Sequence, residues 1–372
     1  MTTIPEEIDI CVSNQCNMRC RYCYSGLLDR SRAQKLDLRR IKLAVLHYLR
    51  AAGLRAEKIS ISGGEPLLEK KLLAALLPWL RKEAGPGMRI ECFSNGLLLD
   101  RPTAELFRRS NVHLRISLDG AARSHDLNRV TCGGGPSFRR VTANIKALPP
   151  DLRRVIGIST TVTRTTAPYL SENIKFLASL GAGDLGLSFA VQEKWGRSDL
   201  GALRRELRAA ARYLSGPGRG AFGEIPKFGY KSLRPGKAWL EKFCGQGEVS
   251  IGPDGVFYPC SIISASRAAQ DPKLRARYGV GDCVSGLDLA KVRASREEAF
   301  RAATASGQSL FLACLLCIYY KDLLEPGDLN AVFKSSADIV RVLREEGMGS
   351  ENPDLPPAPA VKRSRAALSG RG

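Results

Sequence analysis

Residues 8–23 read IDICVSNQCNMRCRYC, a short strand pattern followed at once by three closely spaced cysteines. The β-rich run at 8–12 predicts a strand, and Cys16, Cys20 and Cys23 then fall in the loop directly after it. In a barrel of parallel strands, ligands collect at the loops that follow the carboxyl ends of the strands. Three thiolates on one short loop of this kind suit a metal cluster.

Six strand patterns alternate with amphipathic helical segments up to about residue 190. The predicted strands are 8–12, 58–62, 89–94, 112–118, 155–162 and 185–190, and the predicted helices between them are 37–52, 69–83, 102–109, 137–147 and 169–180. Repeated β-α units of this kind indicate an α/β fold with a parallel sheet. Because there are six units rather than eight, we predict a partial (β/α)6 TIM-like barrel.

A glycine- and proline-rich stretch separates this region from a second one. The helical pattern near 199–214 ends at Gly216-Pro217-Gly218, and little periodicity follows it. We predict a barrel domain over 1–215, a linker over 216–237, a small cysteine-rich domain over 238–325, a C-terminal helix within 326–349 and a disordered tail over 350–372. In the second domain, 249–259 has a hairpin pattern, and weak apolar periodicity suggests stabilisation by metal rather than by an apolar core.

The composition is that of an ordinary soluble protein. Of 372 residues, 44% are hydrophobic and 25% are charged, and no run of eighteen apolar residues occurs, so we expect no membrane association. The acidic start, Met1 to Glu7, lacks the features of a secretory signal, and we therefore predict a cytoplasmic protein. The eleven cysteines are then expected to ligate metal rather than form disulfides.

The formal net charge of +20 has two readings. It favours a polyanionic partner such as tRNA, or an acidic peptide, through long-range attraction. Arginine is scattered along the whole chain, however, and a lineage with GC-rich coding would produce the same excess.

The spacing of the first three cysteines distinguishes two kinds of metal site. A structural zinc ion usually has four protein ligands in two separated pairs, whereas three close thiolates leave one iron of a [4Fe–4S] cluster without a protein ligand. That open iron can bind a small molecule. Zinc is the alternative for this loop.

The pattern Cys16-x-x-x-Cys20-x-x-Cys23, with Tyr22 before the third cysteine, resembles the signature of the radical S-adenosylmethionine (SAM) superfamily. The resemblance implies that these cysteines bind a [4Fe–4S] cluster whose open iron chelates SAM. It also implies reductive cleavage of SAM to a 5′-deoxyadenosyl radical, which abstracts hydrogen from a substrate. An electron donor such as flavodoxin or ferredoxin is expected.

Polar residues follow the second, third and fourth predicted strands, at the same end of the sheet. Ser62-Gly63-Gly64-Glu65-Pro66 resembles the segment of the family that contacts the SAM amine, and its glycines allow close approach of the backbone. Ser117 and Asp119 resemble the family's ribose contacts. The candidate SAM-binding residues are Gly63, Gly64, Glu65, Pro66, Ser94, Asn95, Ser117 and Asp119. The alternative, above all for Ser94 and Asn95, is ordinary turn chemistry at strand ends.

The second cysteine group comprises Cys244, Cys260, Cys314 and Cys317. Four thiolates can close a site completely. Their order resembles the SPASM/Twitch extension of radical SAM enzymes, and because no cysteine follows Cys317 it resembles the shorter Twitch form with one auxiliary [4Fe–4S] cluster. A zinc ribbon is the alternative. Cys283 lies nearby and fits a small buried residue better than a ligand.

Two further residues could take part in chemistry. Cys132, in a glycine-rich loop after the fourth strand, is a candidate hydrogen donor to a substrate radical or a participant in a thioether step, and the alternative is an incidental loop cysteine. His125 could act as an acid or base, or make a fixed turn or cap contact beside Asp126. Cys11 and Cys92 fall within strands and are expected in the core.

The leading hypothesis is a Twitch-type radical SAM enzyme that modifies a ribosomally made peptide after translation. It depends on residues 117–138 and on the second domain, which resemble those of peptide maturases. A radical SAM dehydrogenase or mutase acting on a small metabolite is the second hypothesis. A zinc-stabilised nucleic-acid-binding protein is the third, and the intact cysteine and Gly63-Gly64-Glu65-Pro66 motifs argue against it.

Overall fold

The computed structural model describes residues 5–23, 32–190, 193–222, 227–228, 248–266 and 269–305, helical residues at 338–339, 341–343 and 345, and a turn residue at 346. Cys244, Cys314 and Cys317 lie outside the described residues, as do most of the predicted linker and the whole predicted tail. The predicted C-terminal helix is described only in part. Among the described residues, no helix is long and apolar enough to cross a membrane.

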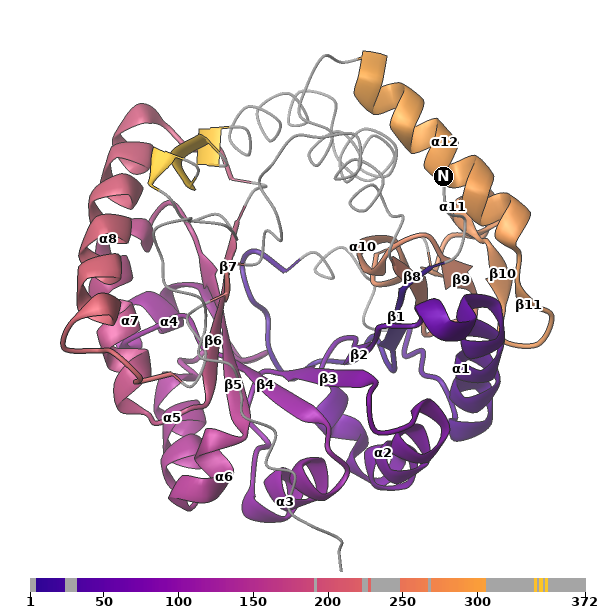
Figure 1. Cartoon of the computed structure of the whole chain (residues 1–372), viewed down its shortest axis with the longest axis horizontal. Coiled ribbons are helices and arrows are strands. Elements are labelled where there is room, and N and C mark those ends of the chain that lie inside the picture. Colours follow the sequence, from indigo (N-terminus) through magenta and orange to yellow (C-terminus); the bar gives the residue numbers. More distant parts are fainter. Residues whose placement is uncertain are drawn as a thin grey trace, which may run out of the picture.

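Nine of the described strands form one large curved sheet with the helices on its outer side (Figure 1). Its strand order is β7-β6-β5-β4-β3-β2-β1-β8-β9. The strands are β1 (Glu7–Cys11), β2 (Lys58–Ser62), β3 (Arg89–Ser94), β4 (His113–Ser117), β5 (Ile156–Val162), β6 (Asp184–Phe189), β7 (Lys227–Phe228), β8 (Glu248–Ile251) and β9 (Phe257–Tyr258). From β1 to β6, each strand pairs in parallel with the next. The predicted α/β partial barrel is therefore confirmed.

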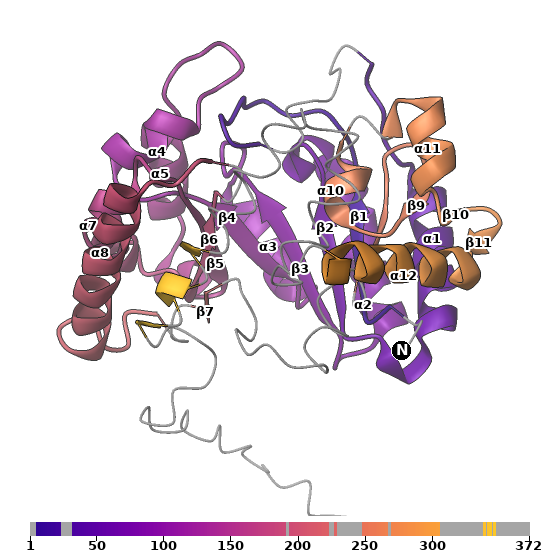
Figure 2. The ribbon, with the colours of Figure 1, turned by 90° about the horizontal axis from the view of Figure 1, so that it is seen from above.

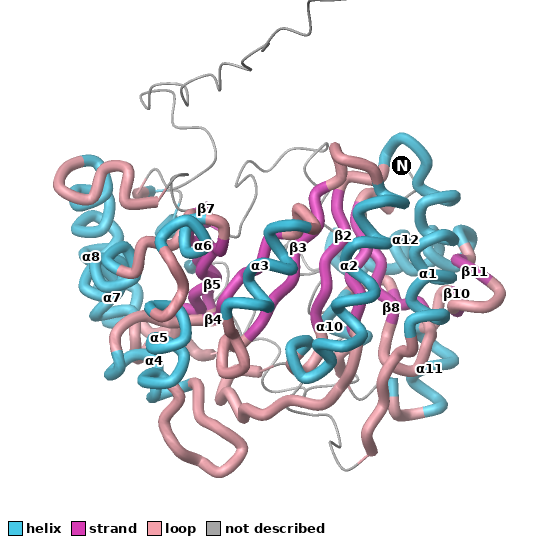
Figure 3. The backbone as a smooth tube through the Cα atoms, turned by 90° about the horizontal axis from the view of Figure 1, so that it is seen from below, coloured by secondary structure: helices cyan, strands magenta, loops and turns pink. Residues whose placement is uncertain are grey.

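Helices between these strands cover the outer face of the sheet (Figure 3). They are α1 (Leu38–Ala52), α2 (Lys70–Ala84), α3 (Arg101–Arg109), α4 (Ala122–Asn128), α5 (Phe138–Lys146), α6 (Pro150–Arg154), α7 (Leu170–Ser179) and α8 (Arg197–Ser215). In α1, the buried residues Ile41, Val45 and Tyr48 recur at helical spacing, and the Asp37 side chain caps the helix by accepting from Arg40 N. The short helices α4 and α6 have no counterpart in the sequence prediction.

The two faces of the sheet differ in chemistry because side chains alternate along each strand. On β1, Ile8 and Ile10 belong to the apolar core shared with the helices. Asp9 lies on the opposite face, in register with Ser60 of β2, and Ser60 is in register with Glu91 of β3. The inner face of the barrel is therefore polar.

The second region extends the same sheet. β8 pairs in parallel with β1, and β8 and β9 form the antiparallel hairpin expected at 249–259. Val249, Ile251 and Phe257 are fully buried and belong to the main apolar core, so the expectation of metal without apolar support was wrong for this hairpin. The predicted boundary between the two domains stays a prediction.

The rest of this region lies beside the first helix of the barrel. It comprises α10 (Ser261–Ser264), α11 (Pro272–Tyr278), β10 (Gly281–Asp282), β11 (Gly286–Leu287) and α12 (Leu289–Ala305). β10 and β11 form a small antiparallel pair, and β11 contacts α1. Figure 2 shows these elements together on the side of the molecule that carries α1.

Candidate functional site

The cysteine loop begins where β1 ends and is held against the end of β2. Gly64 N donates to Ser13 O at 2.7 Å, and Glu65 N donates to Gln15 O at 2.8 Å. A Cβ added at Gly63 would lie 2.5 Å from Ser13 O, and one at Gly64 would lie 2.1 Å from Gln15 O. The close approach that these glycines allow is therefore to the backbone of the cysteine loop.

Glu65 connects the ends of β2 and β3 from a fully buried position. Its carboxylate accepts from Ser94 Oγ at 2.7 Å, from Asn95 N at 2.7 Å and from Leu67 N at 2.9 Å. Burial raises the pKa of Glu65, and these hydrogen bonds oppose that rise. Glu65, Ser94 and Asn95 thus form one hydrogen-bonded unit beside the loop. Pro66, also buried, begins the short helix η3 (Pro66–Glu69) that follows.

Asn95 extends this unit to the first cysteine. Its Nδ2 atom donates to Asn17 Oδ1 at 2.7 Å and lies 3.8 Å from Cys16 Sγ. The Met18 N–H also points at Cys16 Sγ, at 3.4 Å. The sulfur of Cys16 therefore faces two N–H donors, an arrangement that suits a thiolate.

The opposite side of the cysteine loop pairs with the end of α4 and the segment that follows it. Arg19 N donates to Val130 O at 2.8 Å, and Arg21 N donates to Asn128 O at 2.9 Å. Cys132 closes this short ladder, because its Sγ donates to Cys16 O at 3.2 Å. Cys132 therefore contacts the cysteine loop directly, and its thiol is exposed.

Asp119 follows β4 and lies at the centre of a buried polar group. Its Oδ2 accepts from the Tyr22 hydroxyl at 2.5 Å, and its Oδ1 lies 3.0 Å from Arg129 Nε and accepts from Thr161 N at 3.0 Å. The Arg129 guanidinium also lies over the Tyr22 ring, 5.2 Å from its centroid. Asp119 therefore binds the cysteine loop to β4 and β5.

Arg129 also reaches a cysteine of the predicted cluster. Burial raises the pKa of the Cys20 thiol, and the charge and hydrogen bond of Arg129 oppose that rise. Burial lowers the pKa of Arg129 itself. The nearby Asp119, Tyr22 and Cys20 raise this pKa by more than burial lowers it, so its net shift is upward. Arg129 is therefore a permanent buried cation beside Cys20.

His125 has a structural position below this group. It is fully buried, its Nδ1 accepts from Asp119 N at 3.3 Å, and its Nε2 lies 2.9 Å from Ser137 Oγ. Burial, aided by Arg129, lowers the pKa of His125 to about 3, so the imidazole is neutral at neutral pH. Of the two readings of His125, these contacts favour the fixed one. Asp126 caps α5 by accepting from Ser137 N and Phe138 N, each at 2.8 Å.

Ser117 ends β4 in a partly exposed position, in register with Ser159 of β5. Its strand end therefore faces the same end of the barrel as the cysteine loop. Cys11 and Cys92 are fully buried, as expected for core residues.

The three cysteines of the loop are partly exposed, and their donor set fits a cluster with three protein ligands. Within the described parts of the chain, no group of three His, Cys, Asp or Glu side chains is close enough to hold a single metal ion. A [4Fe–4S] cluster makes no such demand, because each thiolate binds a different iron. The N–H donors at Cys16 and the Arg129 cation at Cys20 also suit thiolate ligands.

Of the second cysteine group, the structure describes Cys260, and it also describes the nearby Cys283. Cys260 is buried two residues after the end of β9, and burial together with the nearby Glu248 raises the pKa of its thiol to about 12. Cys283 is 3% exposed, and its N–H donates to Gly255 O at 2.9 Å. The predicted auxiliary cluster stays a prediction, because its other ligands lie outside the described residues.

A buried carboxyl joins the barrel to the second region. Asp9 Oδ2 accepts from Ser62 Oγ of β2 at 2.7 Å and from Ser250 Oγ of β8 at 3.1 Å, and Ser250 Oγ bonds Ser264 Oγ of α10 at 2.6 Å. Burial, together with the nearby Glu248, raises the pKa of Asp9 to about 7. No local sequence pattern indicates this group, because its members are far apart along the chain.

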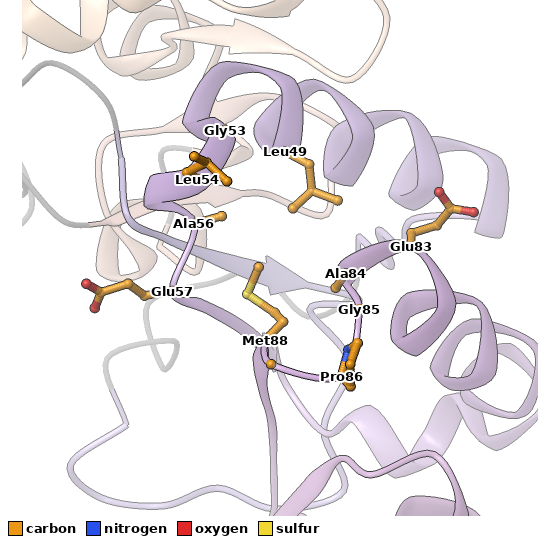
Figure 4. Close-up of a pocket in the computed structure, with 11 residues that line it drawn as sticks. Leu49, Gly53, Leu54, Ala56, Glu57, Glu83, Ala84, Gly85, Pro86 and Met88 are labelled. Atoms are coloured by element: carbon orange, nitrogen blue, oxygen red, sulfur yellow. The ribbon is translucent and has the colours of Figure 1, made fainter.

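Two other features lie toward the amino ends of the strands, away from the cysteine loop. On the inner face, His113 Nε2 lies 2.7 Å from Asp184 Oδ2, and Arg115 Nη1 lies 2.9 Å from Asp184 Oδ1. A groove of about 700 Å³ lies between the ends of α1 and α2 and the start of β3, with Glu57 and Glu83 at opposite edges (Figure 4). Neither feature contacts the loop that carries Cys16.

Comparison with known families identifies this arrangement. Residues 10–188 match the family model described as the radical SAM superfamily. This part of the chain, which is just under half of its length, is therefore a radical SAM domain. Members of the superfamily use a [4Fe–4S] cluster and SAM, which agrees with the predicted cofactors.

Three relatives of known description match parts of the chain. The radical SAM cyclopropyl synthase TigE of Paramaledivibacter caminithermalis is 24% identical over 194 residues, which are 48% of this chain and 40% of TigE. A cysteine-type anaerobic sulfatase-maturating enzyme of Clostridium novyi is 26% identical over 171 residues, 44% of this chain and 45% of that protein. GTP 3′,8-cyclase 3 of Mycobacterium tuberculosis is 26% identical over 216 residues, 56% of this chain and 48% of the cyclase. The chain thus spans less than half of the length of each.

Two solved structures share the fold over longer stretches. The anaerobic sulfatase-maturating enzyme anSMEcpe with bound AdoMet, which is SAM, superposes with a TM-score of 0.64 at 17% identity, over 92% of this chain and 98% of that one. SuiB of Streptococcus suis, bound to its precursor peptide SuiA, superposes with a TM-score of 0.54 at 16% identity, over 74% of this chain and 65% of SuiB. At these identities the comparison shows the fold.

Proposed function

We propose that this chain is a radical SAM enzyme that modifies a ribosomally made peptide after translation. The observation that carries the proposal is the cysteine loop, which is fixed on one side by Gly64 and Glu65 and on the other by Val130 and Cys132. A loop fixed on both sides holds its three thiols in place at the open end of the barrel. The peptide substrate is supported by relatives and structural neighbours described as a sulfatase-maturating enzyme and a precursor-peptide complex.

In this proposal Cys16, Cys20 and Cys23 hold the [4Fe–4S] cluster, which supplies the electron that cleaves SAM. The residues around the strand ends bind and orient SAM, with Ser117 and the main-chain polar groups of Gly63 and Gly64 as its contacts. Glu65 and Asp119 keep the loop in position, because their carboxylates already accept hydrogen bonds from the protein. Ser94 and Asn95 act through Glu65 in the same way.

We further propose an auxiliary [4Fe–4S] cluster at Cys244, Cys260, Cys314 and Cys317. A cytoplasmic location and an electron donor of the flavodoxin or ferredoxin type complete the proposal. The excess of positive charge in this chain, with 57 Lys and Arg against 37 Asp and Glu residues, would attract a donor that carries negative charge. Cys132, exposed beside the cysteine loop, stays the candidate hydrogen donor.

A small-metabolite reaction is the second candidate function. It is favoured by the similarity to GTP 3′,8-cyclase 3, which covers 56% of this chain. The substrates therefore have to be compared directly.

The test is SAM cleavage by the reconstituted full-length enzyme, followed as 5′-deoxyadenosine. Peptides encoded beside the gene are compared with GTP, each against the enzyme with SAM alone. We expect a peptide to change the rate several-fold and to undergo a mass change, with GTP unaltered. Consumption of GTP, with no response to any of the peptides, would replace the peptide proposal by the metabolite one.

A further inference from the structure

Arg129 is a charged side chain that the proposed function leaves unexplained. It is 7% exposed, on the segment that pairs with the cysteine loop. Removing a guanidinium from water is costly unless its charge is compensated. Its presence beside a cluster ligand therefore needs a reason.

The contacts of Arg129 connect one counter-charge to one sulfur. Asp119 Oδ1 lies 3.0 Å from Arg129 Nε. The main-chain hydrogen bonds from Arg19 N to Val130 O and from Arg21 N to Asn128 O place Arg129 opposite Cys20. The ring of Tyr22, two residues after Cys20, lies under the guanidinium. Asp119 is itself fixed by Tyr22 and Thr161, so the cation cannot swing away from the sulfur without breaking a buried ion pair.

We infer that Arg129 is a positioning residue that makes the SAM-binding cluster easier to reduce, through its buried positive charge beside Cys20. The inference rests on the proposed ligation of the cluster by Cys16, Cys20 and Cys23. The potentials of iron–sulfur clusters depend on net charge, on hydrogen bonds to the sulfurs and on solvent exposure. A cluster gains negative charge when it accepts an electron, so a fixed cation at a ligand sulfur stabilises the reduced form.

Asp119 has the opposite effect in this arrangement. Its negative charge offsets part of the positive charge of Arg129, and it also holds the guanidinium in place. Replacing Asp119 by asparagine keeps a side chain of the same shape and removes the offset. Substitutions of Arg129 and of Asp119 should therefore shift the ratio of reduced to oxidised cluster in opposite directions. A general loss of structure would not produce opposite shifts.

The experiment is a redox titration of the reconstituted full-length protein, followed by electron paramagnetic resonance. Titrations are made without SAM, and the signal that changes when SAM is added afterwards is assigned to the Cys16, Cys20 and Cys23 cluster. At a fixed potential, we expect Arg129→Gln to lower the ratio of reduced to oxidised cluster at least tenfold, which is about 59 mV for one electron. Arg129→Lys keeps the charge and should stay within about threefold of the wild type.

Three further variants complete the test. Asp119→Asn should raise the reduced-to-oxidised ratio, and the double variant with Arg129→Gln should return toward the wild type. Arg21→Gln is the matched control, because Arg21 is exposed one residue from Cys20 and its charge is screened by solvent.

The outcomes separate this inference from the proposed function. If the wild type holds no cluster that responds to SAM, the proposed ligation fails. If the cluster is present and Arg129→Gln shifts the ratio no more than Arg21→Gln does, the inference about Arg129 is wrong. If Arg129→Gln assembles no cluster, the Asp119→Asn variant decides, and the absence of an upward shift overturns the inference.

Discussion

The Tyr22 hydroxyl donates a 2.5 Å hydrogen bond to Asp119 Oδ2, and so ties the end of the cysteine loop to the end of β4. Replacing Tyr22 by phenylalanine removes this bond and leaves a buried carboxylate with one partner fewer. Such a loss costs about 1–3 kcal/mol. We expect a lower unfolding midpoint in denaturant and a slower recovery of iron on reconstitution. Unchanged stability of Tyr22→Phe would contradict the role of this bond.

Gly64 should tolerate no side chain. A Cβ there would lie 2.1 Å from Gln15 O, a main-chain atom of the cysteine loop, so Gly64→Ala must displace the loop. We expect most of the iron at the first cluster to be lost. Gly87→Ala is the control, since a Cβ at that position meets no atom within 4 Å. Equal iron content in both variants would show that the loop adapts.

The lowered pKa of His125 should make the folded protein less stable in acid. Its folded pKa of about 3 lies below the ordinary value of 6.5, so the unfolded chain takes up a proton first as the pH falls. The stabilising contribution is complete above pH 6.5 and shrinks toward pH 3. Relative to His125→Gln, the wild type should lose about 2 kcal/mol between pH 7.5 and pH 5. Denaturant titrations at pH 7.5 and pH 5 measure this loss of stability. If the difference in unfolding free energy between the wild type and His125→Gln does not vary with pH, the low pKa of His125 is refuted.

The raised pKa of Asp9 should have the opposite effect and make the folded protein less stable as the pH rises. Burial and Glu248 raise its folded pKa to about 7, against an ordinary value of 3.8, while Lys58 opposes the rise. The protonated form is therefore favoured in the fold, and stability falls as the pH rises through 7. Relative to Asp9→Asn, the wild type should lose on the order of 2–3 kcal/mol between pH 5 and pH 8. A constant difference across this range would show that Asp9 is already ionised at pH 5.

The elements of the barrel could be predicted because their periodicity is local. All six predicted strands are present, with ends displaced by at most one residue, as in β4, which spans His113–Ser117 where 112–118 was expected. The helices α4 and α6 were missed because they are short and have too few apolar positions to show a period. The pairing of β8 with β1 joins residues some 240 positions apart, and no local pattern reports it.

The candidate site could likewise be predicted from the sequence only in part. The cysteine spacing and the strand ends could be found along the chain, so Cys16, Glu65 and Asp119 were all placed at the correct end of the sheet. What each carboxylate contacts could not be found, because Tyr22 and Asp119 are 97 residues apart and meet only through the fold. The role of Arg129 was missed for the same reason. Its only sequence signal was its place in the segment that resembles peptide maturases.

The most direct test of the central claim is the iron and sulfide content of the anaerobically reconstituted protein, with electron paramagnetic resonance before and after addition of SAM. The wild type is compared with a Cys16/Cys20/Cys23→Ala triple variant. We predict about eight irons in the wild type and about four in the variant, as expected for two [4Fe–4S] clusters and one, with a response to SAM only in the wild type. Zinc without sulfide, or a spectrum indifferent to SAM, would contradict the assignment.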